Sequence, residues 1–586
     1  MSRRILIAAA VIAAAAVVTA VYLMRPPPAT PRLVVLITMD AARPDHLGCY
    51  GYGVDTSPAI DRLARRGVVF DDAVSQAPWT TASVATLVTS TFPCQHGLRW
   101  TSGSETAFGG LETNFIRILA SQGFKTASFM AGVDLKQKVP TSELTGKAVR
   151  WLRQNRDGKC VLWIYSYETH YPYVASASCV ERLDPGYQGP YRLRFEDMEV
   201  LKQTRLGRLE ESGLTGADVR HLVALYDCQI AQADKAIGAF VDTLEAWDVL
   251  DQSVVVIFAD HGEEFLEHGT IEHGQQLYEE TIRVPLIVVA PSITDRPGRV
   301  AEQVGLVDLA PTLMDLVGVE PSAAFEGRSL APLLARRSSA PRGATRPCGI
   351  PLDCLIAESV AHRSEKKVLR CPPWKLFFDP FFGATELYNL ADDPQEKRNL
   401  IGARPEVAAA LSETLLKMEK YYPGGWLLAW RGTGGRAGGR ISGKVELGAT
   451  LLEVVPHDFF PEVDTATDSL VAGPDGRSVR FAAGLASDWK GLEIRMAGPA
   501  GATLTLQAAG LPAAKVAVGE SGRVSQCPVA LSPDVARVAR KNLRSMFLTT
   551  DADVLVFWCD PGTEPQAKAR QNEDLRKELK AIGYIQ

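Results

Sequence analysis

The sequence predicts an α/β protein: a three-layer sandwich built on a mostly parallel sheet, followed by a C-terminal β-rich domain. Short, uninterrupted apolar runs are typical of strands buried on both faces of a parallel sheet. Between residues 32 and about 334, segments with helical spacing of apolar residues separate these runs. After Pro423 the pattern changes to the alternation that is typical of half-exposed antiparallel strands.

Length and charge limit the class of protein. A chain of 586 residues is long enough for three or four structural units, which excludes a single small module. Hydrophobic residues make up 46% and charged residues 22%, close to the averages of globular proteins, so an extensively disordered or coiled-coil chain is excluded. The net charge is −5 and no long basic block occurs, which argues against nucleic acid as a partner.

The N-terminal segment has the features of a membrane anchor. Residues 5–24 carry no charge, and a helix of that length can cross a hydrocarbon core about 30 Å thick. Arg3 and Arg4 precede this run, which favours a cytoplasmic N-terminus and export of the rest of the chain to the periplasm or cell exterior. We therefore expect a signal anchor or transmembrane helix at residues 1–24 and a proline-rich linker at 25–31. The alternative is a cleaved signal peptide, whose apolar region is usually shorter.

The cysteine content agrees with export. The chain has ten cysteines, an even number without a CxxC pair, which is compatible with disulfides in an oxidising compartment. Their connectivity does not follow from the sequence, although Cys348 and Cys354 are close enough to close a small loop.

The α/β unit is predicted to occupy residues 32–422. The expected buried strands are residues 33–39, 160–165, 253–259 and 284–290. Helical spacing is clearest from Asp227 to Leu244, and shorter helices are expected at 61–66 and 115–122.

The C-terminal part is predicted to be a separate β-rich domain. Residues 492–496 and 503–506 alternate between apolar and polar side chains, and the composition shift places this domain at 423–545. Residues 546–586 form a last segment, in which 572–585 has one apolar helical face.

Polar side chains follow three of the predicted buried strands. Asp40 ends the first, Glu168 and His170 follow the second, and Asp260 and His261 follow the third. Ligands of open α/β sheets bind beyond the carboxyl ends of strands. Two carboxylates and one imidazole form a donor set that suits zinc or manganese, with calcium or magnesium as the alternative. The competing interpretation is that these carboxylates only cap the following helices.

Five ordered blocks of sequence resemble the sulfatase family of the alkaline phosphatase superfamily. The blocks are residues 40–52, 87–97, 258–285, 307–313 and 386–390. The resemblance implies an alkaline-phosphatase-like fold, one bound divalent metal held by Asp40, Asp260 and His261, and attack on a sulfate or phosphate ester.

The position that corresponds to the family's nucleophile is Thr80, seven residues before Leu87. The family usually has a cysteine or serine there, which is oxidised to formylglycine, and threonine cannot form that aldehyde. The resemblance instead suggests the one-metal, threonine-dependent phosphotransferases of the superfamily, with Thr80 both a nucleophile and a metal ligand. Metal coordination would lower the pKa of its hydroxyl. The alternatives are that Thr81 is the nucleophile, or that Thr80 is only a helix N-cap.

The resemblance also departs from the family pattern elsewhere. Ala41 stands in place of the family's second aspartate, and the lysine-containing segment of the family is absent around residues 129–132.

Two further histidines are candidate catalytic residues. His170 and His273 are expected to donate hydrogen bonds to the anionic group or a proton to the departing alkoxide. The resemblance places His273 where the family often has a substrate-contacting residue; the alternative is two solvated loop histidines. Arg43 is expected to brace the loop after the first strand, and His96 and His268 are expected to be structural.

These observations predict a membrane-anchored, metal-dependent hydrolase of sulfate or phosphate esters with Thr80 as nucleophile. The expected partners are a small-molecule, glycan or lipid-linked ester and the membrane; the sequence does not specify an oligomeric state. One alternative is a phosphotransferase or phosphodiesterase that uses the same site at the membrane surface. Another is a binding protein without catalysis.

Overall fold

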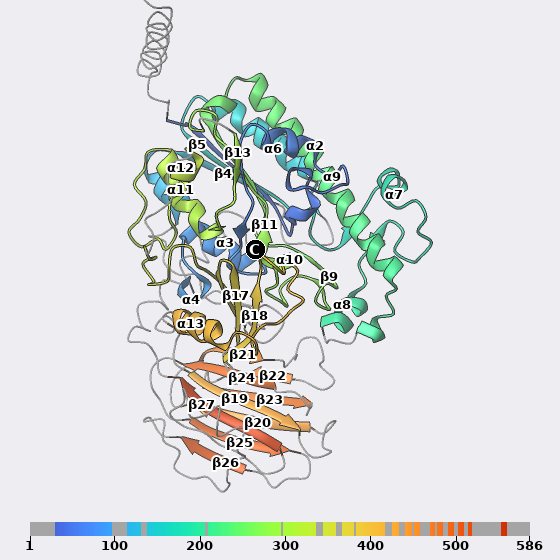
Figure 1. Ribbon diagram of the computed structural model, residues 1–586, viewed down its shortest axis with the longest axis vertical. Coiled ribbons are helices and arrows are strands. Elements are labelled where there is room, and N and C mark those ends of the chain that lie inside the picture. Colours follow the sequence, from blue (N-terminus) through green and yellow to red (C-terminus); the bar gives the residue numbers. More distant parts are fainter. Residues whose placement is uncertain are drawn as a thin grey trace, which may run out of the picture.

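The computed structural model is built around a seven-stranded sheet (Figure 1). It describes residues 30–96, 114–130, 138–205, 209–294, 297–335, 344–358, 366–379 and 383–416, together with strands and short segments between 425 and 559. The strand order is β13-β2-β12-β8-β1-β5-β4. The strands are β1 (Leu33–Met39), β2 (Val68–Phe70), β4 (Lys125–Met130), β5 (Cys160–Ser166), β8 (Ser253–Phe258), β12 (Leu286–Val289) and β13 (Gly298–Val300).

The three central strands confirm the prediction of buried parallel strands. All residues of β1, β5 and β8 are buried, and β1 pairs in parallel with both neighbours. Met39 lies beside Ser166, and Thr38 lies beside Phe258. Because the three strands run in the same direction and in register, their carboxyl ends meet at one edge of the sheet.

One predicted strand runs the other way. The apolar run at 284–290 forms β12, which is antiparallel to both β8 and β2. Every residue of β12 is buried. An uninterrupted apolar run indicates that both faces of a strand are buried. It does not indicate the direction of the strand, which depends on how the chain connects it to its neighbours. The sheet is therefore mostly parallel, with one antiparallel strand inside it.

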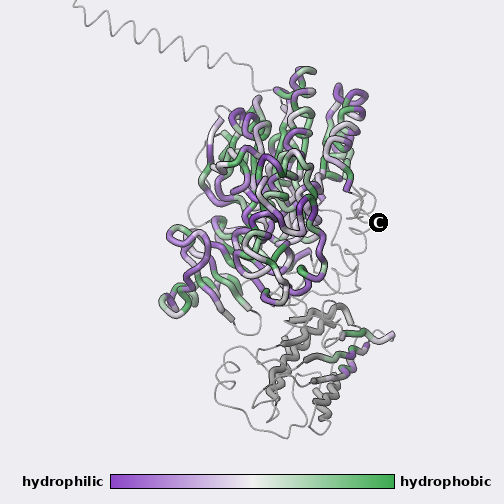
Figure 2. The backbone as a smooth tube through the Cα atoms, turned by 90° about the vertical axis from the view of Figure 1, so that its right-hand side faces the viewer, coloured by the Kyte–Doolittle hydropathy of each residue, from purple (hydrophilic) through white to green (hydrophobic). Residues whose placement is uncertain are grey.

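Helices cover both faces of the sheet. On one side, α2 (Pro58–Ala64) and α6 (Thr141–Asn155) pack against α9 (Gly216–Ala246); on the other, α3 (Thr80–Thr89) and α5 (Phe115–Ser121) pack against α11 (Leu309–Leu316). The helices at the top of Figure 2 carry both hydrophobic and hydrophilic residues, as expected where one helical face packs on the sheet. The predicted three-layer sandwich is confirmed.

A second, four-stranded antiparallel sheet follows the sandwich. Its strands are β15 (Leu355–Ala357), β16 (Lys367–Cys371), β17 (Trp374–Asp379) and β18 (Gly383–Asn389), and α13 (Pro405–Leu416) packs on it. A disulfide joins Cys354 to Cys371 across its first two strands. The small loop considered for Cys348 and Cys354 is therefore wrong, because Cys354 pairs across the sheet and Cys348 is a free, buried thiol.

The C-terminal region is β-rich, as predicted. One antiparallel sheet has the order β21-β24-β19-β27 and the other β22-β23-β20-β25-β26. Their strands include β20 (Arg440–Leu447), β21 (Leu451–His457), β22 (Ser469–Ala472), β23 (Ser478–Gly484), β24 (Lys490–Met496), β25 (Ala502–Ala508) and β26 (Ala514–Val518). Strand β27 (Ala552–Cys559) pairs with β19 (Gly425–Gly432), so the first sheet takes in residues beyond the expected boundary at 545. The predicted helix at 572–585 lies outside the described residues.

No helix within the described part of the chain combines the length and the apolar character needed to cross a bilayer. The predicted anchor at residues 1–24 and most of the linker lie outside that part.

Candidate active site

The carboxyl edge of the central sheet brings together the three predicted metal ligands. Asp40 directly follows β1, and Asp260 and His261 follow β8. One ligand atom from each of the three side chains lies within 4.8 Å of the others, and all three residues are buried. His261 Nε2 is 3.3 Å from Asp40 Oδ1 and 3.4 Å from Asp260 Oδ2. We call Asp40, Asp260 and His261 the ligand triad.

The environment of Asp40 fits a bound cation. Both of its carboxylate oxygens are buried, and among the described residues neither has a hydrogen-bond partner. Burial, followed by the charges of Asp260 and Glu263, raises the pKa of Asp40 well above its ordinary value. Buried carboxylates normally need a counter-charge or hydrogen bonds. A divalent cation between the three side chains would supply this charge.

Neighbouring elements fix the orientation of Asp260. Tyr165, from β5, donates a hydrogen bond from its hydroxyl to Asp260 Oδ2 at 2.6 Å. Ser83, from α3, donates to the main-chain oxygen of Asp260, also at 2.6 Å. The first of these partners fixes the carboxylate and the second ties helix α3 to the end of β8. Sequence analysis did not identify Tyr165 or Ser83, because their contacts depend on how separate elements meet.

Thr80 lies beside the ligand triad. Its Oγ1 is 3.0 Å from His261 Nε2. Thr80 is the first residue of α3, and Trp79 occupies the N-cap position with an extended backbone. The alternative that Thr80 is only an N-cap is therefore wrong, because the helix starts at Thr80 itself and Trp79 is the N-cap. Of the two candidate threonines, Thr80 is the one whose hydroxyl has this contact with His261.

The candidate histidines form a row that leads away from Thr80. The ring centroids of His261 and His273 are 4.2 Å apart, and those of His273 and His170 are 4.8 Å apart. His170 and His273 are buried, which excludes the alternative of two solvated loop residues. His273 Nδ1 lies 3.0 Å from Glu263 Oε1.

The protonation of the three rings differs. Burial lowers the pKa of His261 to about 4 and that of His170 well below its ordinary value. Burial also acts to lower the pKa of His273, but the adjacent carboxylate of Glu263, assisted by Glu272 and Asp260, outweighs it and raises that pKa. His273 is thus the ring that most readily carries a proton, whereas His261 is neutral and able to bind a metal.

Lys138 is a site residue that sequence analysis missed. Its Nζ contacts the main-chain oxygens of Glu168, His170 and Pro172, on the loop that carries His170. Burial lowers its pKa to about 7, against the opposing charges of Asp40, Glu168 and Glu263. The sequence contains no signal for this role, because Lys138 follows no predicted strand.

The residues that we expected to be structural have structural contacts. Arg43 donates to the main-chain oxygen of Glu263 at 3.0 Å and pairs with Asp45 at 2.8 Å, so it braces the loop after β1. His268 pairs with Glu280 and stacks on Tyr278. His96 Nε2 lies 3.0 Å from the Thr86 hydroxyl.

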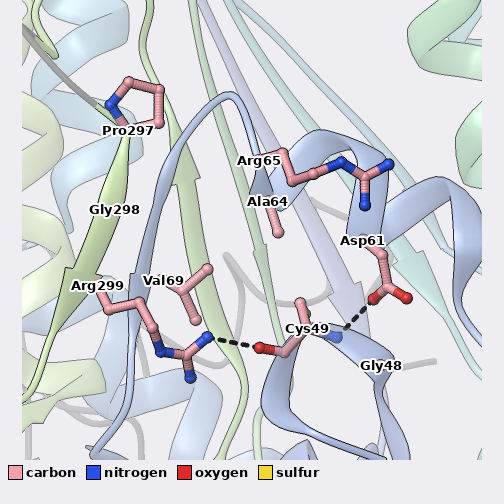
Figure 3. Close-up of a pocket in the computed structure, with 9 residues that line it drawn as sticks. All are labelled: Gly48, Cys49, Asp61, Ala64, Arg65, Val69, Pro297, Gly298 and Arg299. Carbon is pink, nitrogen blue, oxygen red and sulfur yellow. Dashed lines mark hydrogen bonds between the residues drawn. The ribbon is translucent and has the colours of Figure 1, made fainter.

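A surface pocket lies between the loop after β1 and the edge strand β13 (Figure 3). Arg299 donates to the main-chain oxygen of Cys49 at 2.6 Å, and Asp61 accepts from the Cys49 amide at 2.7 Å. Burial, reinforced by the charge of Asp61, raises the pKa of the Cys49 thiol to about 12, so this cysteine is a poor nucleophile. None of the residues that line the pocket belongs to the site around Thr80.

Comparison with known sequences identifies relatives for part of the chain. The model of the family described as Sulfatase matches residues 32–319. Arylsulfatase K of Gallus gallus is 29% identical over 214 residues, which cover 35% of this chain and 38% of the relative. Arylsulfatase K of Danio rerio is 29% identical over 243 residues, covering 40% of this chain and 44% of the relative. The chain thus matches less than half the length of these curated relatives.

Solved structures share the fold. One, determined in complex with its substrate D-glucosamine-2-N,6-O-disulfate, superposes with a TM-score of 0.54 at 19% identity, over 67% of this chain and 97% of its own. The phosphonate monoester hydrolase of Agrobacterium radiobacter superposes with a TM-score of 0.52 at 18% identity, over 66% of this chain and 95% of its own.

Proposed function

Because residues 32–319 form a sulfatase-family domain, we propose that this protein is a metal-dependent hydrolase that cleaves sulfate or phosphate esters through Thr80. The observation that carries the proposal is the position of the Thr80 hydroxyl, 3.0 Å from a nitrogen of the ligand triad. A hydroxyl group at that point lies beside the residues that would hold a cation, and it could attack an ester bound in front of it.

The ligand triad would hold one divalent cation, with zinc or manganese favoured because His261 supplies nitrogen. When bound, the metal neutralises charge on the ester and lowers the pKa of the Thr80 hydroxyl. Tyr165 keeps the carboxylate of Asp260 in place through its hydrogen bond. All three ligands are buried, which limits the access of bulk water to their metal-binding atoms.

In the proposed reaction the Thr80 hydroxyl gives up its proton to solvent, and its Oγ1 forms a bond to the sulfur or phosphorus of the ester. The bond between this sulfur or phosphorus and the ester oxygen breaks, and the alkoxide takes a proton from His273 and leaves as the alcohol. Water then attacks the sulfated or phosphorylated Thr80, which releases sulfate or phosphate, restores the hydroxyl with one proton of the water and returns the other proton to His273. The N-terminus of α3, where Thr80 lies, favours the negative charge of the transferred group.

His273 and His170 serve the departing alcohol. The raised pKa of His273 makes it the proton donor to the leaving oxygen. A lowered pKa keeps the His170 ring neutral; its Nδ1–H donates to the main-chain oxygen of Tyr171, which leaves Nε2 to accept a hydrogen bond from the departing alcohol. Glu263 holds the ring of His273 and stabilises its protonated form.

The curated relatives are named arylsulfatase K, which supports a sulfate ester as substrate. A solved structure that shares the fold is named a phosphonate monoester hydrolase, which supports keeping phosphorus esters in the proposal. We extend the proposal to glycan or lipid-linked esters, and to a location outside the cytoplasm with residues 5–24 as the membrane anchor.

The proposal is tested by a metal-supplemented screen of aryl sulfates, phosphate monoesters and phosphodiesters. Wild type should hydrolyse at least one class, Thr80→Ala should lose several orders of magnitude in rate, and the matched control Thr81→Ala should stay within about tenfold of wild type. Normal turnover by Thr80→Ala would refute the proposal. Retained activity in Thr80→Ala with loss in Thr81→Ala would move the nucleophile to the next residue.

A further inference from the structure

Glu272 is a buried acidic residue that directly precedes His273 in the chain. It ends β10 (Ile271–Glu272), which pairs antiparallel with β9 (Glu264–Phe265). The φ angle of Glu272 is +80°, in the left-handed region that residues other than glycine rarely adopt. Such a backbone conformation persists only where surrounding contacts hold it, and it is found most often at functional sites. The β9–β10 hairpin therefore needs a contact that holds Glu272.

This contact comes from α8 (Met198–Arg205). Arg205, the last residue of the helix, donates from Nη2 to the carboxylate of Glu272 and forms an ion pair with it. The two side chains are 14% and 9% exposed, so the pair is largely shielded from water. Burial acts to raise the pKa of Glu272, but the charge of Arg205, followed by that of His273, outweighs it and lowers this pKa. Glu272 is thus ionised, and its charge is compensated from outside the hairpin.

Helix α8 is attached to the body of the domain independently of this ion pair. It packs against β10, and one of its faces is buried through Val200, Leu201 and Thr204. A disulfide between Cys179 of α7 (Ala177–Leu183) and Cys228 of α9 fastens the segment that leads to it. Arg205 therefore holds Glu272 from a separately anchored element.

His273 is held at both ends of the β9–β10 hairpin. Its Nδ1 lies 3.0 Å from Oε1 of Glu263, which directly precedes β9, and its main chain directly follows Glu272 at the end of β10. Glu263 fixes the ring, whereas Glu272 fixes the main chain from which the ring projects. A proton donor must lie within hydrogen-bond distance of the atom that it protonates, and a misplacement of about 1 Å can lower the rate about 100-fold.

We infer that Arg205 and Glu272 are positioning residues for His273, and that their ion pair holds the imidazole where it can protonate the departing alcohol. The inference rests on the proposed function, in which His273 is the proton donor. It predicts that the ion pair matters most when the leaving group is strongly basic, because a weakly basic leaving group departs without a proton. A pair that only stabilised the fold would affect all esters alike.

The test compares the 4-nitrophenyl and phenyl esters of sulfate and of phosphate by kcat/KM, which reports on the steps up to cleavage of the ester bond. Phenolate is far more basic than 4-nitrophenolate. Arg205→Met should lower kcat/KM about 100-fold for the phenyl ester and less than about threefold for the 4-nitrophenyl ester. Arg205→Lys keeps the charge and should restore most of the lost activity. The matched control is Lys202→Met, because Lys202 forms an exposed pair with Glu199 on the same helix, and it should change neither ester.

Two further measurements guard against a variant that fails to fold, since Arg205→Met leaves a buried carboxylate unpaired. The double variant Arg205→Met/Glu272→Gln has no such unpaired charge, and it should show the same selective loss of the phenyl ester. Hydrogen exchange requires no turnover: the amides of residues 271–273 should exchange several-fold faster in the double variant than in wild type, and at the wild-type rate in Lys202→Met.

Equal losses for the two esters in the double variant would overturn the inference and leave the pair a structural role. So would an unchanged rate for the phenyl ester, or wild-type hydrogen exchange of residues 271–273. Failure of the proposed function is a separate result. It shows as normal turnover by Thr80→Ala, whereas the positioning role is judged by the ratio between two esters and by hydrogen exchange. His273→Gln should share the selective loss, and equal losses there would overturn the inference together with the proposed role of His273.

Discussion

The buried carboxylate of Asp40 lies close to Asp260 and Glu263, and no hydrogen-bond partner for it occurs in the part of the chain that the structure describes. This arrangement is unfavourable without a cation, because buried like charges repel one another. A carboxylate in such a position favours binding of a cation, and it destabilises the fold when no metal is bound. The ligand triad is therefore expected to make stability depend on metal.

Asp40→Asn should remove this unfavourable charge. In the metal-free wild type, the pKa of Asp40 is higher in the folded than in the unfolded protein. Protonated Asp40 therefore adds to folding stability below about pH 4, and this stability is lost as the pH rises through the pKa of the folded state. The EDTA-treated variant should therefore be more stable than EDTA-treated wild type at neutral pH, by about 1–3 kcal/mol. The stabilities of wild type and Asp40→Asn are compared by thermal unfolding, once in EDTA and once with added zinc or manganese.

With metal present the order should reverse, because the wild type gains the full binding free energy whereas the variant offers a neutral amide oxygen in place of a carboxylate and binds the cation more weakly. Asp260→Ala should likewise lose most of its bound metal while it remains folded. Equal metal content in folded Asp260→Ala and wild type would contradict the ligand assignment.

Lys138 provides a second test at the residue scale. Its Nζ donates hydrogen bonds to three main-chain oxygens. Only the charged ammonium form has the three N–H groups that these bonds need. With a pKa of about 7, the wild type should lose activity as pH rises above neutrality, because the loop that carries His170 loses one contact. Lys138→Met should lower kcat by about 100-fold, the usual effect of a small misplacement.

The alkaline decline should also disappear in Lys138→Met, since no group remains to lose the proton. Lys147→Met is the matched control, because Lys147 is exposed on α6 and forms its ion pair with Glu143, four residues earlier on the same helix. The pH profile of this variant should match wild type. An unchanged alkaline limb in Lys138→Met would rule out this role.

At the scale of elements, the sequence predicted the strands better than their directions. The apolar runs of β1, β5 and β8 identify central strands because both faces of each are covered by helices. The same run in β12 belongs to an antiparallel strand. The meeting of Asp40 with Asp260 and His261 was predictable from the shared strand ends. The contacts of Lys138 and Tyr165 were not, because loop and side-chain positions depend on packing between distant segments.

Asp234 tests how one element supports another. This residue of α9 accepts hydrogen bonds from the amides of Ala59 and Ile60, at the start of α2. Asp234→Ala should lower the free energy of unfolding by about 1 kcal/mol, the usual effect of losing a cap. The control is Asp242→Ala on the same helix, which breaks only an exposed pair with Arg62 and should change stability by less than about 0.5 kcal/mol. Thermal unfolding distinguishes them, and equal effects would contradict the capping role.

At the scale of the whole molecule, the sequence predicts an anchored enzyme with the α/β unit before the β-rich region. The order of these two regions agrees with the structure. The anchor is a separate prediction, based on the length of the uncharged run at 5–24 and on Arg3 and Arg4. The β-rich region could be recognised by its alternating pattern, but the pairing of β27 with β19 could not, since strands far apart in sequence have no local signal for pairing.

Mass spectrometry of the mature N-terminus tests the anchor. The expected chain keeps residues 5–24, and a reporter fused after Pro31 should be active outside the cytoplasm. A mature chain that begins between Ala20 and Arg32 would replace the anchor with a cleaved signal peptide.

The central claim is that unmodified Thr80 forms the covalent bond to the substrate. The most direct measurement is peptide mass spectrometry of the enzyme before substrate and after rapid quenching during turnover. We predict an unmodified Thr80 in the resting enzyme and a sulfated or phosphorylated Thr80 after quenching, with no such peptide from Thr80→Ala. A transferred group on another residue, with Thr80 unmodified throughout, would contradict the claim.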